Sequence, residues 1–107
     1  MGGDLSPERL LLAYSRGIFP WFSSDEPILW WAPDPRAILE PSEFIVSKSF
    51  GKSLKKRGYR LSLNKEFSSV VRACAAPRPS QEGTWILPSM ISAYSALHRL
   101  GYAHSIE

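Results

Sequence analysis

Tryptophan and proline are concentrated in residues 17–36, where their rings could recognise a flat or apolar ligand group. Three of the four tryptophans lie in this segment, at Trp21, Trp30 and Trp31. Proline fixes its own φ angle, removes a backbone donor and pushes the preceding residue toward an extended conformation. The segment is therefore predicted to be stiff, with its large rings held in place. Such rings suit stacking against a ligand and equally suit an aromatic core, so the pattern alone leaves both interpretations open.

Two histidines and one cysteine are further residues that could do chemistry. His98 and His104 could act as general bases because histidine titrates near neutrality, but no pattern of a Ser or Cys nucleophile accompanies them. We expect His98, which follows Leu97 on a predicted helix, to be structural. Cys74 is the only cysteine, which excludes an internal disulfide and gives no metal cluster. We expect it to be a small core residue.

Basic residues are concentrated between residues 44 and 65, where the sequence contains no acid. They are Lys48, Lys52, Lys55, Lys56, Arg57, Arg60 and Lys65. The whole chain has only a mild excess of positive charge, with thirteen Lys and Arg against ten Asp and Glu. A local basic surface attracts polyanions such as nucleic acid. A solvated helix face would also explain the pattern, but such a face normally carries acids for i,i+4 pairing.

Chain length, hydrophobic runs and cysteine count limit the class of protein. The 107 residues suffice for one small domain, or for one small unit and part of another. No run of about 18 apolar residues is present, so we expect no membrane span. No stretch near Met1 has the apolar centre of a signal peptide. Together with the single cysteine, these features lead us to expect a cytoplasmic protein.

Residues 1–41 are expected to form a first unit with one helix and two short strands. Pro7 suits a first helical position, Ser6 can cap the helix, and Gly17 is typical of a C-terminal stop. The strands are expected on either side of a proline turn, over residues 28–31 and 36–39. Across that turn, Asp34 and Arg36 are predicted to form a local ion pair.

Residues 42–107 are expected to form a second unit, after a break at residues 41–43. Periodicity and stop signals predict helices over residues 47–57, 65–75 and 88–100. Asn64 is expected to cap the second of these helices. Alternation predicts strand segments at residues 59–63 and 102–107, and proline and glycine predict a loop at residues 76–83. The fold class is therefore predicted to be α+β.

Several motifs, in this order, closely resemble the bacterial leucyl/phenylalanyl-tRNA–protein transferases. They lie at Gly2–Ser6, Arg16–Phe22, Trp30–Arg36, Gly83–Ile86 and Ala103–Glu107. Members of that family continue past the position of Glu107 and usually have residues before Gly2, so the chain resembles an N-terminal portion. The resemblance implies a small N-terminal α/β subdomain, residues 1–41. It also implies the first part of an acetyltransferase-like (GNAT-type) domain, residues 42–107.

The resemblance also implies an activity. The family moves leucine, phenylalanine or methionine from an aminoacyl-tRNA to the N-terminal Arg or Lys of a protein, which marks that protein for degradation through the N-degron pathway. The reaction is aminolysis of an activated ester, so no cofactor or metal is implied. The catalytic acids proposed for the family lie beyond Glu107. We therefore expect no catalytic residue in this chain and no transfer by the chain alone.

The resemblance assigns two sets of binding residues. It places Trp21 and Trp85 in the wall of an aminoacyl-adenosine pocket, with Tyr14 and Tyr94 also lining that site. The alternative for all four is an aromatic core. Trp30 and Trp31 are adjacent on a predicted strand and should face opposite ways, so we expect one to be core. The resemblance assigns phosphate contacts with the tRNA acceptor stem to Lys52, Lys55, Lys56, Arg57 and Arg60.

Two other functions stay open at this stage. One is a non-catalytic nucleic-acid-binding module that uses the basic stretch and exposed aromatic rings. The other is a structural or protein-interaction domain whose tryptophans form a core. Steep salt dependence of tRNA binding would separate the first two hypotheses from the third. Transfer of labelled leucine to a peptide that starts with Arg would separate the enzyme from the binding module.

Overall fold

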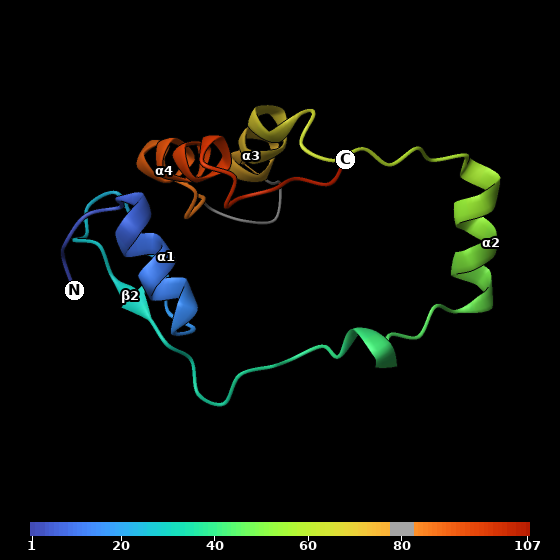
Figure 1. Cartoon of the computed structure of the whole chain (residues 1–107), viewed down its shortest axis with the longest axis horizontal. Helices are drawn as coiled ribbons and strands as arrows, with labels where there is room; N and C mark the ends of the chain where they lie inside the picture. The colour runs from blue at the N-terminus through green and yellow to red at the C-terminus, as the bar shows by residue number, and fades with distance from the viewer. Residues whose placement is uncertain (78–82) are drawn as a thin grey trace.

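The fold is a small α+β arrangement, seen in a computed structural model that describes residues 1–77 and 83–107 (Figure 1). Its elements in chain order are α1 (Pro7–Ser15), β1 (Phe19–Pro20), β2 (Trp30–Trp31), the 3-10 helix η1 (Pro41–Glu43), α2 (Lys48–Arg57), α3 (Phe67–Ala75) and α4 (Pro88–Arg99). Within the described residues, no helix is long and apolar enough to cross a membrane. Of the loop predicted at residues 76–83, residues 78–82 lie outside the described part.

Helix α1 begins at Pro7 and ends just before Gly17, which adopts a φ of 71°, as predicted. The predicted cap is wrong in its chemistry, because the hydroxyl of Ser6 makes no capping hydrogen bond. The Oδ1 atom of Asp4 instead accepts from the Ser6 backbone N–H and from Nε of Arg9, both at 3.1 Å. A carboxylate near the positive end of the helix dipole thus holds the first turn.

The two-stranded sheet differs from the predicted one. Strand β2 pairs antiparallel with β1, so that Phe19 lies opposite Trp31, and residues 36–39 form no strand. The Arg36 side chain turns to the end of α1 instead: its Nη1 donates to the Gly17 carbonyl at 2.6 Å, and its guanidinium lies 5.7 Å from the centre of the Phe19 ring. The predicted ion pair between Asp34 and Arg36 is therefore wrong as well. The chain folds back on the α1 end instead of forming a hairpin around the proline turn.

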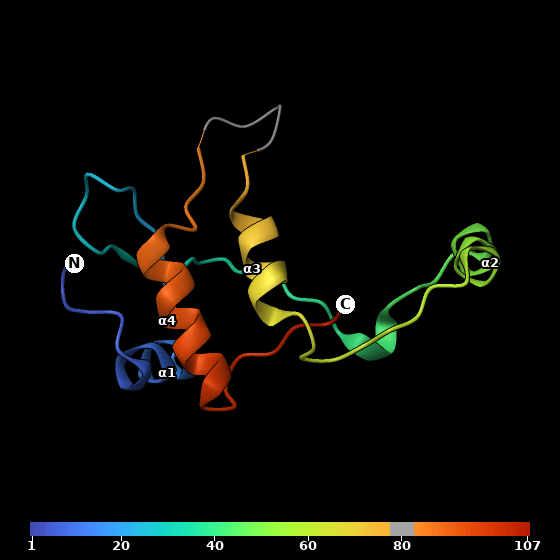
Figure 2. The ribbon, with the colours of Figure 1, turned by 90° about the horizontal axis from the view of Figure 1, so that it is seen from above.

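The core lies where α1 crosses α4. Leu10 of α1 and Met90 of α4 are completely buried, and Leu10 packs in one cluster with Ala93 and Leu97. Helix α3 lies beside α4 (Figure 2). At that contact the Phe67 ring stacks on the imidazole of His98, with ring centres 4.0 Å apart and planes within 2°.

Helix α3 corrects two predictions. It begins at Phe67 rather than at residue 65, because Asn64 takes a φ of 59° and uses its side chain in another contact. Its Oδ1 accepts from the Ser105 N–H at 3.1 Å, so Asn64 joins two distant segments instead of capping the helix. Cys74 is exposed, not core, because the last turn of α3 borders an open cavity beside Trp85.

The two strand segments predicted in the second unit shrink to one antiparallel bridge between Leu63 and Ile106. Ser62 and Glu107 exchange backbone hydrogen bonds of 2.8 and 2.9 Å beside that bridge. The remaining predicted strand residues form no ladder within the described part of the chain. The pairing therefore exists at the predicted places but is much shorter.

Helix α2 stands apart from the other helices at the far end of two extended segments (Figures 1 and 2). It begins after Ser47, whose Oγ accepts from the Phe50 N–H at 3.2 Å, and ends at Gly58, which has a left-handed φ of 61°. No residue of α2 is buried. The helix predicted over residues 47–57 is therefore confirmed, with local cap and stop signals fixing its ends.

Candidate functional site

The two tryptophans assigned to the pocket lie against each other. Trp21 follows β1 and Trp85 precedes α4, and their ring centres are 5.8 Å apart with the planes tilted by 35°. Trp21 is 52% exposed and Trp85 is 36% exposed. Two large rings that are close together and still open to solvent are available for stacking on a ligand, whereas core rings are not.

The two tyrosines join this pair from the side of the helices. The hydroxyls of Tyr14 on α1 and Tyr94 on α4 share a hydrogen bond, and their rings meet edge to face with centres 6.3 Å apart. Burial, and then the hydrogen bond with Tyr14, raise the pKa of Tyr94, so its phenol stays neutral. Tyr94 also lines a small cavity of about 90 Å³ with Trp85. All four predicted residues thus form one connected aromatic cluster, in which Tyr14 takes part through Tyr94.

An open cavity lies between the tryptophans and the turn that precedes α4. It has a volume of about 380 Å³, and its walls include Trp21, Ser23, Thr84, Trp85 and Leu87. The Thr84 Oγ1 accepts from the Ile86 N–H at 3.1 Å and so fixes the turn that carries Trp85. Volumes of about 300–1,000 Å³ are typical of small-molecule sites. We call this space the indole cavity.

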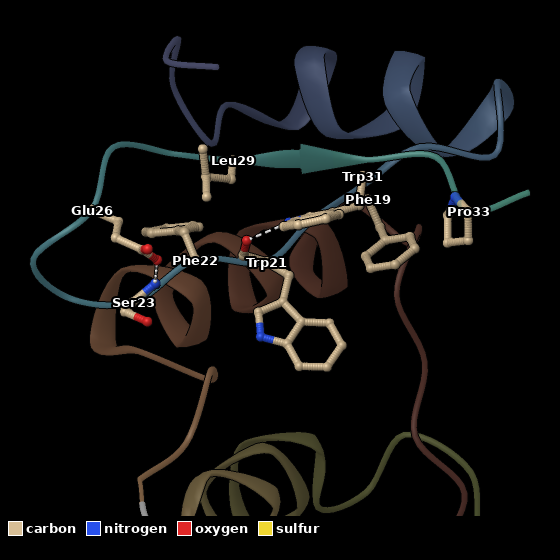
Figure 3. Close-up of a pocket in the computed structure, with 8 residues that line it drawn as sticks. All are labelled: Phe19, Trp21, Phe22, Ser23, Glu26, Leu29, Trp31 and Pro33. Carbon is tan, nitrogen blue, oxygen red and sulfur yellow. Dashed lines mark hydrogen bonds between the residues drawn. The ribbon is translucent and has the colours of Figure 1, made fainter.

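A second cavity adjoins the first and was missed by the sequence analysis (Figure 3). It has a volume of about 360 Å³, and its apolar walls are Phe19, Trp21, Phe22, Leu29, Trp31 and Pro33. Its polar lining is Ser23 and Glu26. We call it the aromatic–acid cavity. Its aromatic walls all lie in the segment 17–36 that the sequence already indicated, but the register of β1 against β2 is needed to gather them around Ser23 and Glu26, for which there was no sequence signal.

Trp30 and Trp31 divide their roles as predicted from strand alternation. Trp30 packs partly buried against the core, and its Nε1 donates to the Gly2 carbonyl at 2.9 Å. Trp31 is 50% exposed and lines the aromatic–acid cavity, where its Nε1 donates to the Trp21 carbonyl at 2.7 Å. That bond fixes the Trp31 ring relative to Trp21 (Figure 3).

The basic residues form a separate surface on and after α2. Lys52, Lys55, Lys56, Arg57 and Arg60 are all exposed. Arg57 donates to the Tyr59 hydroxyl at 2.9 Å. Across residues 1–77 and 83–107, the only ion pair joins Arg9 to Asp4, so no acid neutralises the α2 surface. The structure does not bring this surface into the aromatic cluster.

The histidines are engaged in structural contacts. His98 is stacked on Phe67, and its Nδ1 donates to the Ala103 carbonyl at 2.8 Å, which ties α4 to the segment after it. The Nδ1 of His104 accepts from the amide of Asn64 at 2.9 Å, since the amide oxygen of Asn64 is already bonded to Ser105. No cluster of three or more His, Cys, Asp or Glu able to hold a metal occurs among the described residues.

Fold and site together define a small α+β unit with two distinct surfaces. One is an open cavity walled by aromatic rings, and the other is a separate row of cations without acid partners among the described residues. Comparison with known families is specific. One family profile, described as leucyl/phenylalanyl-tRNA protein transferase, matches residues 38–107, and the profile of that protein's N-terminal domain matches residues 3–34. The chain belongs to this family, and the predicted resemblance is confirmed.

Curated relatives carry the name leucyl/phenylalanyl-tRNA–protein transferase. The protein of Enterobacter sp. (strain 638) is 62% identical over 107 residues, covering 100% of this chain and 45% of the relative. The protein of Nitrosospira multiformis is 59% identical over 107 residues, covering 100% and 46%. That of Anaeromyxobacter sp. is 57% identical over 108 residues, covering 100% and 46%. This chain therefore spans slightly less than half the length of these relatives.

Proposed function

We propose that this chain provides the aminoacyl-adenosine site and a tRNA-docking surface of an aminoacyltransferase. In this proposal the complete enzyme moves Leu, Phe or Met from aminoacyl-tRNA to the N-terminal Arg or Lys of proteins that are to be degraded. The observation that carries the proposal is the exposed Trp21–Trp85 pair beside a cavity, in a chain that belongs to the transferase family. Deep burial of both rings would have favoured a core instead.

The aromatic cluster suits the terminal adenosine of a charged tRNA. An adenine ring can stack on an indole face, and base–aromatic stacking contributes about 1–3 kcal/mol per base. The hydroxyls of Ser23 and Thr84 in the indole cavity can bond a ribose or a base edge. Tyr94, neutral because its pKa is raised, closes the inner side of the cluster next to Trp85.

Helix α2 suits the phosphate backbone of the acceptor stem. Its lysines and Arg57 are exposed and form no ion pair among the described residues, and phosphate contacts position a nucleic acid without reading its sequence. Because α2 stands apart from the aromatic cluster, it can contact the acceptor stem while the aminoacylated end of the tRNA lies at that cluster (Figure 1). This division supports one ligand that spans both surfaces, although each could act alone.

The proposed chemistry is simple in its balance of atoms. The neutral α-amine of the acceptor attacks the carbonyl of the aminoacyl ester, so that an amide bond forms and the ester C–O bond to the ribose breaks. The amine loses a proton, and the departing ribose oxygen gains one and becomes a hydroxyl. The ester is already activated, so neither metal nor diffusible cofactor enters the proposal. In this proposal the catalytic acids lie outside residues 1–107, and we expect these residues alone to bind without transferring.

The proposal includes the division of the chain at residues 41 and 42. Residues 42–107 would begin a GNAT-type domain. Support comes from the order of elements, in which α3 and α4 lie between the two partners of the antiparallel Leu63–Ile106 bridge. An antiparallel bridge whose two partners are joined through two helices can be extended into a larger α/β sheet by further strands.

The test uses calorimetry to measure the binding of a non-hydrolysable phenylalanyl-adenosine amide to the 107-residue chain. Trp21→Ala should weaken binding by about tenfold, which corresponds to loss of about 1.4 kcal/mol of stacking. Tyr102→Ala, which removes another exposed ring that lines neither cavity, is the control and should leave binding unchanged. Equal affinities for Trp21→Ala and the unaltered chain would contradict the site assignment. The non-catalytic alternative would be favoured if the full-length protein bound tRNA but never transferred leucine.

A further inference from the structure

The aromatic–acid cavity lies in a segment whose charge is opposite to that of α2. Residues 18–35 contain the acids Asp25, Glu26 and Asp34 and no Lys or Arg, whereas residues 44–65 contain many cations and no acid. Arg36, which follows this segment, is bonded to the Gly17 carbonyl. The chain therefore separates a surface that suits a polyanion from a cavity that suits a cation.

Glu26 is held with one carboxylate oxygen free. Its Oε2 accepts from the Ser23 N–H at 2.9 Å, and its own N–H donates to the Ser23 carbonyl at 3.1 Å, so a tight turn fixes the side chain (Figure 3). Within the described residues, Oε1 of Glu26 has no hydrogen-bond partner. An oriented carboxylate at the rim of a cavity can accept from an ammonium or guanidinium group.

The walls suit the rest of such a ligand. Trp21 and Trp31 present rings that are half-exposed, and Trp31 is locked by its bond to the Trp21 carbonyl. Aromatic faces attract cations and also pack against alkyl stems, as in the side chains of arginine and lysine. A purely apolar ligand would leave the Glu26 carboxylate unused.

We infer that the aromatic–acid cavity binds the cationic side chain of an N-terminal arginine or lysine in an acceptor peptide, with Glu26 as its charge partner. This inference rests on the proposed function. Trp21 and Ser23 border both cavities, so the two spaces adjoin, and the α-amine of a residue whose side chain fills the aromatic–acid cavity can reach the indole cavity. That is where the aminoacyl ester would lie.

The test uses the 107-residue chain and two peptides that differ only at residue one, arginine or its neutral isostere citrulline. Binding is followed by NMR through the indole N–H resonances, of which that of Trp31 reports on the cavity directly. The arginine peptide should bind about fivefold to tenfold more tightly than the citrulline peptide, as expected for a cation at an aromatic and anionic site. Glu26→Gln should remove this preference, while Glu43→Gln, the same change at an exposed acid on η1, should keep it.

Three results would overturn the inference: equal binding of both peptides, an unchanged preference in Glu26→Gln, or equally tight binding of a norleucine peptide. The last result would make the cavity an apolar subsite. The adenosine amide is titrated into the same Glu26→Gln sample, where its affinity should be unchanged. If the unaltered chain did not bind the adenosine amide, the proposed function would be contradicted. If it bound the adenosine amide but did not prefer the arginine peptide to the citrulline peptide, only the role of this cavity would be contradicted.

Discussion

The hydrogen bond between Tyr14 and Tyr94 predicts an asymmetric effect of removing either hydroxyl. The two hydroxyls are bonded to each other, and each has no other hydrogen-bond partner within residues 1–77 and 83–107. Their surroundings differ, because Tyr14 is 45% exposed whereas Tyr94 is partly buried with its pKa raised mainly by burial. Replacing Tyr94 by phenylalanine therefore leaves a hydroxyl that can reach water, whereas replacing Tyr14 leaves one that is poorly accessible to water.

Tyr14→Phe should be the more damaging change. It leaves the Tyr94 hydroxyl in a poorly solvated place without a partner, and an unsatisfied buried group costs about 1–3 kcal/mol. Tyr94→Phe leaves the Tyr14 hydroxyl, which can bond water, so the loss is limited to the net value of a hydrogen bond, about 0.5–1.5 kcal/mol. The double replacement removes both polar groups and should cost less than the sum of the single changes.

Urea denaturation followed by circular dichroism measures the free energy of unfolding of the four proteins. The double-mutant cycle isolates the coupling between the hydroxyls, which we expect to be about 1 kcal/mol. Phenylalanine keeps the edge-to-face contact of the rings, so packing is nearly matched across the series. A Tyr14→Phe protein as stable as the unaltered chain, or less destabilised than Tyr94→Phe, would refute the reasoning.

Three further predictions concern the core, the carboxylates and α2. Leu10→Ala should lower the free energy of unfolding by about 2–5 kcal/mol, while Leu12→Ala on the exposed face of α1 should change it by less than about 0.5 kcal/mol. The pKa of Asp4 is lowered to about 2 by hydrogen bonds from Ser6 and Arg9, and that of Glu107 to about 2 by hydrogen bonds from Ser105, Ser62 and Glu66. Because the folded-state pKa values lie below the ordinary ones, the two carboxylates stabilise the fold above about pH 4.5, and this stabilisation is lost as the pH falls toward 2. In Glu107→Gln, the free energy of unfolding should therefore fall less steeply with acidification than in the unaltered chain. Replacing Lys52, Lys55 and Lys56 by alanine should reduce the slope of log K against log salt for an acceptor-stem RNA by about 2–3, as measured by anisotropy, with Arg99→Ala on α4 as control.

The helices could be predicted from sequence because their signals are local. Pro7 and Gly58 act within one turn of the helices that they delimit, and these helices appear where expected. The strand partners could not be predicted, because pairing is decided by competition between distant segments. Trp30 and Trp31 pair with Phe19 and Pro20, which precede them by about ten residues, and not with the segment that follows the proline turn.

The candidate site shows the same division between local and distant information. Trp21 and Trp85 could be named in advance only because their motifs resemble those of a known family. Glu26 could not, because an acid in a polar loop has no distinguishing pattern. Its position becomes meaningful only when β1 pairs with β2 and gathers aromatic side chains around it.

The tryptophan–proline segment supplies both a core ring, Trp30, and a ring of the cavity that we propose as a ligand surface, Trp31. Strand alternation turns Trp30 toward Leu10 and the core, and turns Trp31 into the aromatic–acid cavity. The Nε1 of Trp30 bonds the Gly2 carbonyl, so the buried ring anchors the strand that presents the exposed one. A change at Trp30 should therefore alter ligand binding without any ligand contact, because it would release the backbone that orients Trp31 and, through the bond to its carbonyl, Trp21. Rigidity of this segment is thus part of the site, since rings that are held in place before binding lose less conformational entropy when a ligand arrives.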